Sequence, residues 1–239
     1  ASKKIVFEIY HVGVVPGGSG NTDQILISAA DRAGGFIGKS TSTDIRHSNV
    51  AIAQITGTQK VGGFIGEAYE DTISNSYAEL TFVPTGNSTY IGGAVGVVTN
   101  DKELTIEGVN TSLTSSGSAD LVTKLGGLVG GYATTTAAKL NIRNSKANIN
   151  TELDGSSHGG LIGSYITNHA TPMDNIVNSV ASGVIGINSK STNNNNRGGF
   201  IGDADRVEIK RSIADIDVHG YNNISGGIAS VAFVGFLSN

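Results

Sequence analysis

The chain is poor in several residue types, and each shortage argues against a class of protein. Cysteine is absent, so the fold does not rest on disulfide bridges. With 34 glycines but only 3 prolines, the chain is neither collagen nor a proline-rich linker. The net charge is −4 and no run of Lys and Arg is longer than Lys3-Lys4, which argues against a nucleic-acid partner. No apolar run approaches the ~18–20 residues of a membrane span.

The dominant feature is a repeated pentapeptide. The pattern Gly-Gly-apolar-apolar-Gly occurs at 34–38, 62–66, 92–96, 126–130, 159–163 and 198–202, and a degenerate copy lies at 226–230. Successive copies begin 28, 30, 34, 33, 39 and 28 residues apart. A period of this length predicts a solenoid, because one short repeat buries its apolar face only against its neighbours.

A second pattern, Ile-x-x-Ser-x-Ala-x-Ile, lies between the glycine motifs. Its first position is isoleucine in six repeats: Ile45, Ile73, Ile106, Ile142, Ile176 and Ile209. After the serine, small or apolar residues alternate with polar ones, which is typical of a half-buried strand. Stacked units of this kind predict an all-β protein, a right-handed parallel β-helix (β-solenoid) of six to seven coils, in which Ile142 is buried against Ile106 and Ile176. The glycines then serve a corner that needs either positive φ or close approach of backbones.

Together the two patterns resemble the GLUG repeat. The glycine motif is followed by Ile-Ser-Asn-Ser-Tyr-Ala at 73–78, with further versions at 142–147 and 176–181, and the resemblance covers about residues 25–230. Similar repeats occur in non-catalytic stretches of bacterial surface adhesins and IgA-type metallopeptidases. The resemblance implies a parallel β-helix in an extracellular or bacterial cell-surface location, and it supplies no catalytic residue. Residues 5–15 lack the motif and Pro16–Asn21 is interpreted as a joint, so we divide the chain into an N-terminal strand or cap with its joint, 1–21, and a GLUG-repeat solenoid, 22–239.

Little in the sequence points to catalysis or to a cofactor. A zinc peptidase would need His-Glu-x-x-His on a helix, and none of the five histidines lies in that pattern, so we expect turn or surface positions for His11, His47, His158, His169 and His219. A polysaccharide-cleaving β-helix needs clustered carboxylates, and the best local pair is Asp203 and Asp205. At the register of Asp203 the other coils hold Lys39, Glu67 and Val97, so we predict no carboxylate column and no cofactor. The alternative left open is a weak calcium site at Asp203 and Asp205.

Loop lengths indicate where a binding surface would lie. The distance from Gly-Gly to the isoleucine is 11 residues in the repeats that start at 34, 62 and 198, but 14, 16 and 17 in those that start at 92, 126 and 159. Extra residues at one corner of adjacent coils predict a ridge that includes Asn100, Asp101, Lys102, Tyr132, Tyr165, Asn168, His169 and Asp174. Tyrosine faces beside polar groups suit contact with a host-surface protein or glycan. The alternative is neutral drift in loop length.

We therefore predict a non-enzymatic structural or adhesive β-solenoid of a bacterial cell-surface or secreted protein. Its expected partners are a host-surface protein or glycan, flanking domains, or copies of itself. One alternative is a self-assembling extracellular fibre subunit joined end to end, because the apolar stretch 228–237 carries no polar cap. The other alternative is a β-helix enzyme that acts on polysaccharide.

Overall fold

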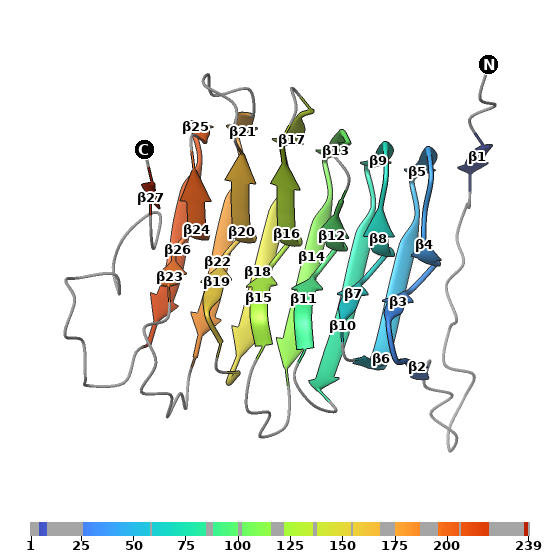
Figure 1. Ribbon diagram of the computed structural model, residues 1–239, viewed down its shortest axis with the longest axis horizontal. Coiled ribbons are helices and arrows are strands. Elements are labelled where there is room, and N and C mark those ends of the chain that lie inside the picture. Colours follow the sequence, from blue (N-terminus) through green and yellow to red (C-terminus); the bar gives the residue numbers. More distant parts are fainter. Residues whose placement is uncertain are drawn as a thin grey trace.

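The protein is a stack of short parallel strands. The computed structural model describes residues 5–8, 26–57, 59–84, 88–99, 102–115, 122–135, 138–153, 155–167, 175–186, 196–205, 207–219 and 237–238. These residues form 27 strands and no helix. The strands pair in parallel in four sheets, which the chain visits in turn, so that four consecutive strands make one coil of a parallel β-helix (Figure 1).

Apart from β27, each sheet takes every fourth described strand of the chain. Sheet A holds β1 (Ile5–Glu8), β5 (Thr43–Arg46), β9 (Asp71–Ser74), β13 (Leu104–Glu107), β17 (Leu140–Arg143), β21 (Asn175–Val177) and β25 (Glu208–Lys210). Sheet B holds β2 (Leu26–Ala29), β6 (Asn49–Gly57), β10 (Tyr77–Pro84), β14 (Asn110–Ser115), β18 (Lys146–Thr151), β22 (Val180–Ile185) and β26 (Ile213–Val218). Sheet C holds β3 (Arg32–Gly34), β7 (Lys60–Gly62), β11 (Ser88–Gly92), β15 (Val122–Gly126), β19 (Ser157–Gly159) and β23 (Asn196–Gly198). Sheet D holds β4 (Ile37–Lys39), β8 (Ile65–Ala68), β12 (Val95–Val98), β16 (Val129–Thr134), β20 (Ile162–Thr167), β24 (Ile201–Asp205) and β27 (Leu237–Ser238).

The described strands make six coils, from coil one (β3–β6) to coil six (β23–β26), each in the order C, D, A, B. β1 pairs with β5 in coil one and β27 pairs with β24 in coil six, so these two strands lie at opposite ends of the stack (Figure 1). The predicted parallel β-helix is confirmed. The degenerate repeat at 226–230 and most of the predicted segment 1–21 lie outside the described residues.

Inside the helix, like residues stack on like. Ile106, Ile142 and Ile176 are consecutive partners in the register of sheet A and are at most 1% exposed. Ile45 and Ile73 are buried in the same column, while Ile209 in the last described coil is half-buried. The predicted burial of Ile142 between its two neighbours is therefore confirmed.

The corner between sheets A and B is a single left-handed residue. The residue that follows the A strand has φ between 47° and 64° in all six coils, at His47, Asn75, Gly108, Asn144, Asn178 and Arg211. Asn and Gly adopt this conformation at the least cost, and they occupy the four central coils. This column is called the left-handed ladder below.

The serine of the Ile-x-x-Ser pattern joins its coil to the one before it in coils two, four, five and six, whereas coil three has Val109 at this position. The Ser145 hydroxyl donates to Arg143 O (2.7 Å) and accepts from the backbone N–H of Val109 in the preceding coil (3.2 Å). Equivalent pairs of bonds are made by Ser76, Ser179 and Ser212. Because these groups are largely removed from water, each hydroxyl satisfies a backbone donor that would otherwise be costly to bury. This column is called the serine ladder below.

The motif glycines are required by close approach of backbones and not by positive φ. A Cβ on Gly127 would lie 2.2 Å from Gly160 O of the next coil, and a Cβ on Gly130 would lie 2.5 Å from Gly96 O of the preceding coil. Among the described glycines, positive φ is found at Gly108, Gly183 and Gly186, none of which belongs to the motif. Of the two reasons considered from the sequence, close approach is thus the one that holds.

The third glycine of the motif provides a matched test of this packing. Gly130→Ala places a methyl group against Gly96 O and Ile91 N, so we expect a loss of about 1–3 kcal/mol or more in the free energy of unfolding. Gly38 has the same position in coil one, where the nearest contact of an added Cβ is 3.2 Å from Arg32 O. Urea denaturation of Gly130→Ala and Gly38→Ala should show a clearly smaller loss for Gly38→Ala. Equal losses would contradict the packing explanation.

Candidate functional site

The two tyrosines of the predicted ridge lie in the core. Tyr132 in β16 and Tyr165 in β20 are partners in the register of sheet D, and their rings stack with centroids 5.4 Å apart and planes 3° from parallel. They are only 2% and 0% exposed, so neither ring offers a face to a ligand. The expectation that they form a contact surface is corrected. Their position follows the inward column of sheet D, which holds Ala68, Val98 and Ala204 in other coils.

The other members of the predicted ridge are only partly described. Asn100, Asp101, Asn168, His169 and Asp174 lie outside the described residues. Lys102 is described, and its ammonium pairs with Glu70 at 2.7 Å and lies 4.8 Å from the centre of the Tyr69 ring. The described part of the extended corner therefore contacts the preceding coil, and the ligand role of Asp101, Asn168 and His169 stays a prediction.

The carboxylates Asp203 and Asp205 lie in β24 on either side of Ala204. Asp203 is in register with Ser164, and the same column continues through Gly131, Val97 and Glu67 to Lys39. Burial raises the pKa of Asp203 above its usual value, the charge of Lys124 opposes this rise, and the neighbouring Asp205 adds to it. In the described part of the chain, no three His, Cys, Asp or Glu residues gather as a metal site would require. The calcium alternative thus rests on two carboxylates.

One histidine differs from the expected turn or surface position. His158 lies in β19, is fully buried, and its Nε2 is 3.0 Å from Val122 O of the preceding coil. His47 occupies a corner of the left-handed ladder, as expected of a turn residue. The surface interpretation was therefore wrong for His158, whose position belongs to the buried column that holds Val61, Ile91 and Leu125.

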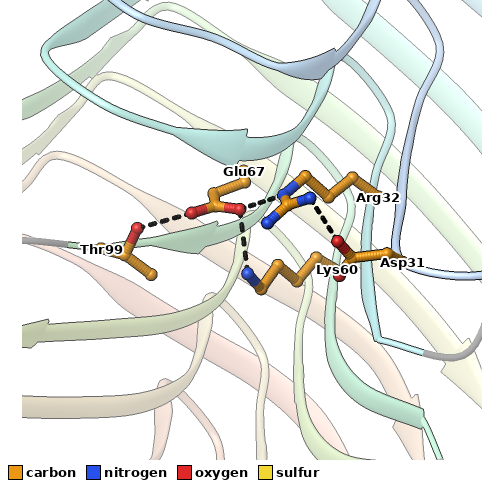
Figure 2. Close-up of polar contacts among 5 residues, drawn as sticks. All are labelled: Asp31, Arg32, Lys60, Glu67 and Thr99. Atoms are coloured by element: carbon orange, nitrogen blue, oxygen red, sulfur yellow. Dashed lines mark hydrogen bonds and ion pairs between the residues drawn. The ribbon is translucent and has the colours of Figure 1, made fainter.

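The strongest electrostatic cluster surrounds Glu67, which the sequence interpretation named only for its register. The carboxylate is 6% exposed and accepts hydrogen bonds from Arg32 Nε, from Lys60 Nζ at 2.9 Å and from Thr99 Oγ1 at 2.9 Å. Figure 2 shows these three side chains converging on Glu67, with Asp31 pairing with the far side of Arg32. Arg32 belongs to coil one, Lys60 and Glu67 to coil two, and Thr99 to coil three. One carboxylate therefore holds three coils together.

The cluster strongly favours the ionised form of Glu67. Burial alone would raise the pKa of this carboxyl, but the hydrogen bonds from Arg32, Lys60 and Thr99 together outweigh burial and lower the pKa to about 2. A carboxylate held by two cations in this way is inert as a general acid or base near neutral pH. The arrangement therefore serves to fasten coils. A sequence signal for it exists, because Arg32, Lys60 and Lys124 each stand two residues before a Gly-Gly pair.

The comparisons with known proteins identify no relative. No protein-family model matches the chain, and neither a curated protein nor a solved structure does so. Within the described residues there is also no helix with the length and apolar character needed to cross a membrane. The structure of this chain and its sequence therefore carry the functional argument.

The pH dependence of stability tests the Glu67 cluster. Because the pKa of Glu67 is lowered in the folded protein, its contribution is complete above the unfolded value of about 4.5 and is lost as the pH falls toward 2. This shift corresponds to about 3 kcal/mol of the free energy of unfolding at neutral pH. Urea denaturation of the parent and of Glu67→Gln should therefore differ at pH 7 and converge near pH 2.

The control for that measurement is Glu70→Gln, which removes a carboxylate whose side chain is 46% exposed and which pairs with Lys102 alone among the basic residues described. Its effect at pH 7 should be much smaller than that of Glu67→Gln, because solvent and salt screen a surface ion pair. A difference between the parent and Glu67→Gln that does not change with pH would contradict the assigned role of the carboxylate.

Proposed function

We propose that this chain is a non-enzymatic structural or adhesive β-solenoid of a bacterial cell-surface or secreted protein, in which it acts as a stiff spacer. The observation that carries the proposal is the placement of β1 and β27 at opposite ends of a continuous stack (Figure 1). A chain that enters at one end and leaves at the other separates whatever is attached to it. Because β1 and β27 lie one strand beyond coil one and coil six, seven spacings of ~4.8 Å hold such attachments roughly 30–35 Å apart.

Specific contacts between coils support the mechanical part of this proposal. The serine ladder joins the A–B corners of successive coils, and Glu67 joins coils one, two and three. A solenoid unit contacts only its neighbours, so its resistance to force depends on such links repeated along the axis. The location outside the cell rests on the resemblance of the motifs at 62–66 and 73–78 to the GLUG repeat.

Single-molecule force spectroscopy tests the spacer role. The chain, flanked by reference domains and pulled from its ends, should resist force and then yield in steps that each release one repeat of 28–39 residues. At ~3.5 Å per extended residue, each step lengthens the chain by about 100–140 Å. Extension without any force peak, or release of fragments from a panel of polysaccharides by the same protein, would contradict the proposal.

The serine ladder offers a matched pair of variants for this measurement. Ser145→Ala removes a buried hydroxyl that links coils three and four, so we expect a lower unfolding force and a loss of about 1–3 kcal/mol. Ser112→Ala removes a half-buried hydroxyl of β14 that makes no hydrogen bond in the described part of the chain. The force for Ser112→Ala should equal that of the parent. Equal reductions for both variants would show that the ladder is not what resists force.

A second candidate, the fibre subunit joined end to end, is favoured by the outer strands of sheet B. β2 and β26 are the first and last described strands of this sheet, and they carry Leu26 and Ile213 with 65% and 61% exposure. Exposed strand edges of this kind are templates for pairing with another chain. Sedimentation velocity over a range of concentrations distinguishes the two candidates. Growth in multiples of the monomer that Ile213→Asp abolishes would support the fibre, and a monomer at every concentration would exclude it.

A further inference from the structure

The left-handed ladder is interrupted at Gly108. Where two asparagines follow each other, the side chains pair, and Asn178 Nδ2 donates to Asn144 Oδ1 at 3.2 Å. Gly108 supplies no side chain between Asn75 and Asn144, although its φ of +64° suits asparagine. A Cβ built on Gly108 would lie 2.7 Å from Asn75 Oδ1, so the Asn75 side-chain amide lies next to the position that a side chain of residue 108 would occupy.

A groove of about 480 Å³ lies at this interruption. Small residues of coils two and three, Thr72, Ser74 and Gly108, line part of it. Longer side chains from coils one to four complete the lining: Arg46, His47, Asn75, Glu107 and Asn144. The groove crosses the coils along the outer A–B corner, and it is open to solvent.

The groove offers both hydrogen-bond donors and acceptors, and it carries one carboxylate, Glu107, without an ion-pair partner among the described residues. The side-chain amide of Asn75 makes no hydrogen bond within the described part of the chain, and the Asn144 amide nitrogen makes none there either. Each amide provides both donors and an acceptor. The Arg46 guanidinium already pairs with both carboxylate oxygens of Asp44, which is 1% exposed. Glu107 adds a carboxylate with two acceptor oxygens.

We infer that this groove binds a neutral oligosaccharide. Adjacent hydroxyls of a sugar both donate and accept, which matches amides and hydroxyls spaced along successive coils. The lining holds no large apolar side chain for an apolar peptide segment, and Glu107 disfavours an anionic polymer. The inference rests on the adhesive form of the proposed function, and it names the class of ligand.

Nuclear magnetic resonance of the side-chain amides gives a direct test. The probes are cellohexaose, mannohexaose and chitohexaose, with a heparin hexasaccharide as the anionic comparison. At least one neutral probe should shift the side-chain NH₂ signals of Asn75 and Asn144 in a saturable way at millimolar concentration, and the heparin fragment should not. The salt concentration should leave the binding of the neutral probe unchanged, because no ion pair forms.

The deciding variant is Gly108→Asn, which fills the missing place in the ladder. The contact it creates is with the flexible end of Asn75, so the variant should fold and should melt no lower than the parent. Binding of the neutral probe should weaken about tenfold or more, which corresponds to the loss of 1.4 kcal/mol of hydrogen bonding. The control is Arg211→Asn, which places the same residue at another left-handed corner outside the groove and should leave binding unchanged.

Three results would overturn the inference: no saturable shift with any neutral probe, equal affinity of Gly108→Asn and the parent, or tighter and salt-sensitive binding of the heparin fragment. These results leave the spacer role intact, because force spectroscopy tests that role without a ligand. Conversely, if the chain binds the neutral probe but extends without a force peak, the inference about the groove stands and the spacer proposal fails.

Discussion

The close approach of backbones at the corner between sheets C and D sets the geometry on which the other contacts depend. Apart from Gly38 in coil one, the motif glycines of coils one to five at this corner lie where a Cβ would meet a carbonyl or amide of an adjacent coil, as at Gly127 against Gly160 O. With this spacing fixed, four sheets stack coil upon coil over six coils, with one shift of register between β6 and β10 at Leu80 and Phe82. The serine ladder depends on the same spacing, because a hydroxyl reaches the N–H of the preceding coil only at that distance.

The described polar groups divide between fastening coils and facing solvent. Glu67 and the serine ladder are buried and paired, and their hydrogen bonds cross from coil to coil. The left-handed ladder lies outside, and it pairs with itself where asparagines follow each other. Gly108 suits the positive φ of this corner but has no side chain to continue the left-handed ladder, and the groove lies where that side chain is missing. The backbone conformation of Gly108 and the proposed binding groove therefore depend on the same residue.

The sequence predicted the features that recur from coil to coil. It missed those that depend on which face of a strand a side chain occupies. The parallel solenoid and the Ile142 column follow from residues that recur at one register, whereas close approach at the glycines was one of two reasons that the sequence left open. The burial of Tyr132 and Tyr165 was missed because counting loop residues locates a corner but not the direction of a side chain. The residue six after the first glycine is small or apolar at Ala68, Val98 and Ala204, and that pattern would have predicted burial. Glu67 was missed because its partners come from three coils, and only the stacked register brings them together.

The in-register stack is tested most directly by distances between spin labels. The chain has no native cysteine, so labelled cysteines can be introduced in pairs. Ala51, Glu79, Ser112, Asn148, Ser182 and Asp215 occupy one outward register of sheet B, one in each coil. At ~4.8 Å per coil, the backbone positions of Ala51 and Asn148 should lie about 14 Å apart, and those of Ala51 and Asp215 about 24 Å apart. The length of the two labels adds to each of these distances. Distances that do not increase with the number of coils between the labels would contradict the account.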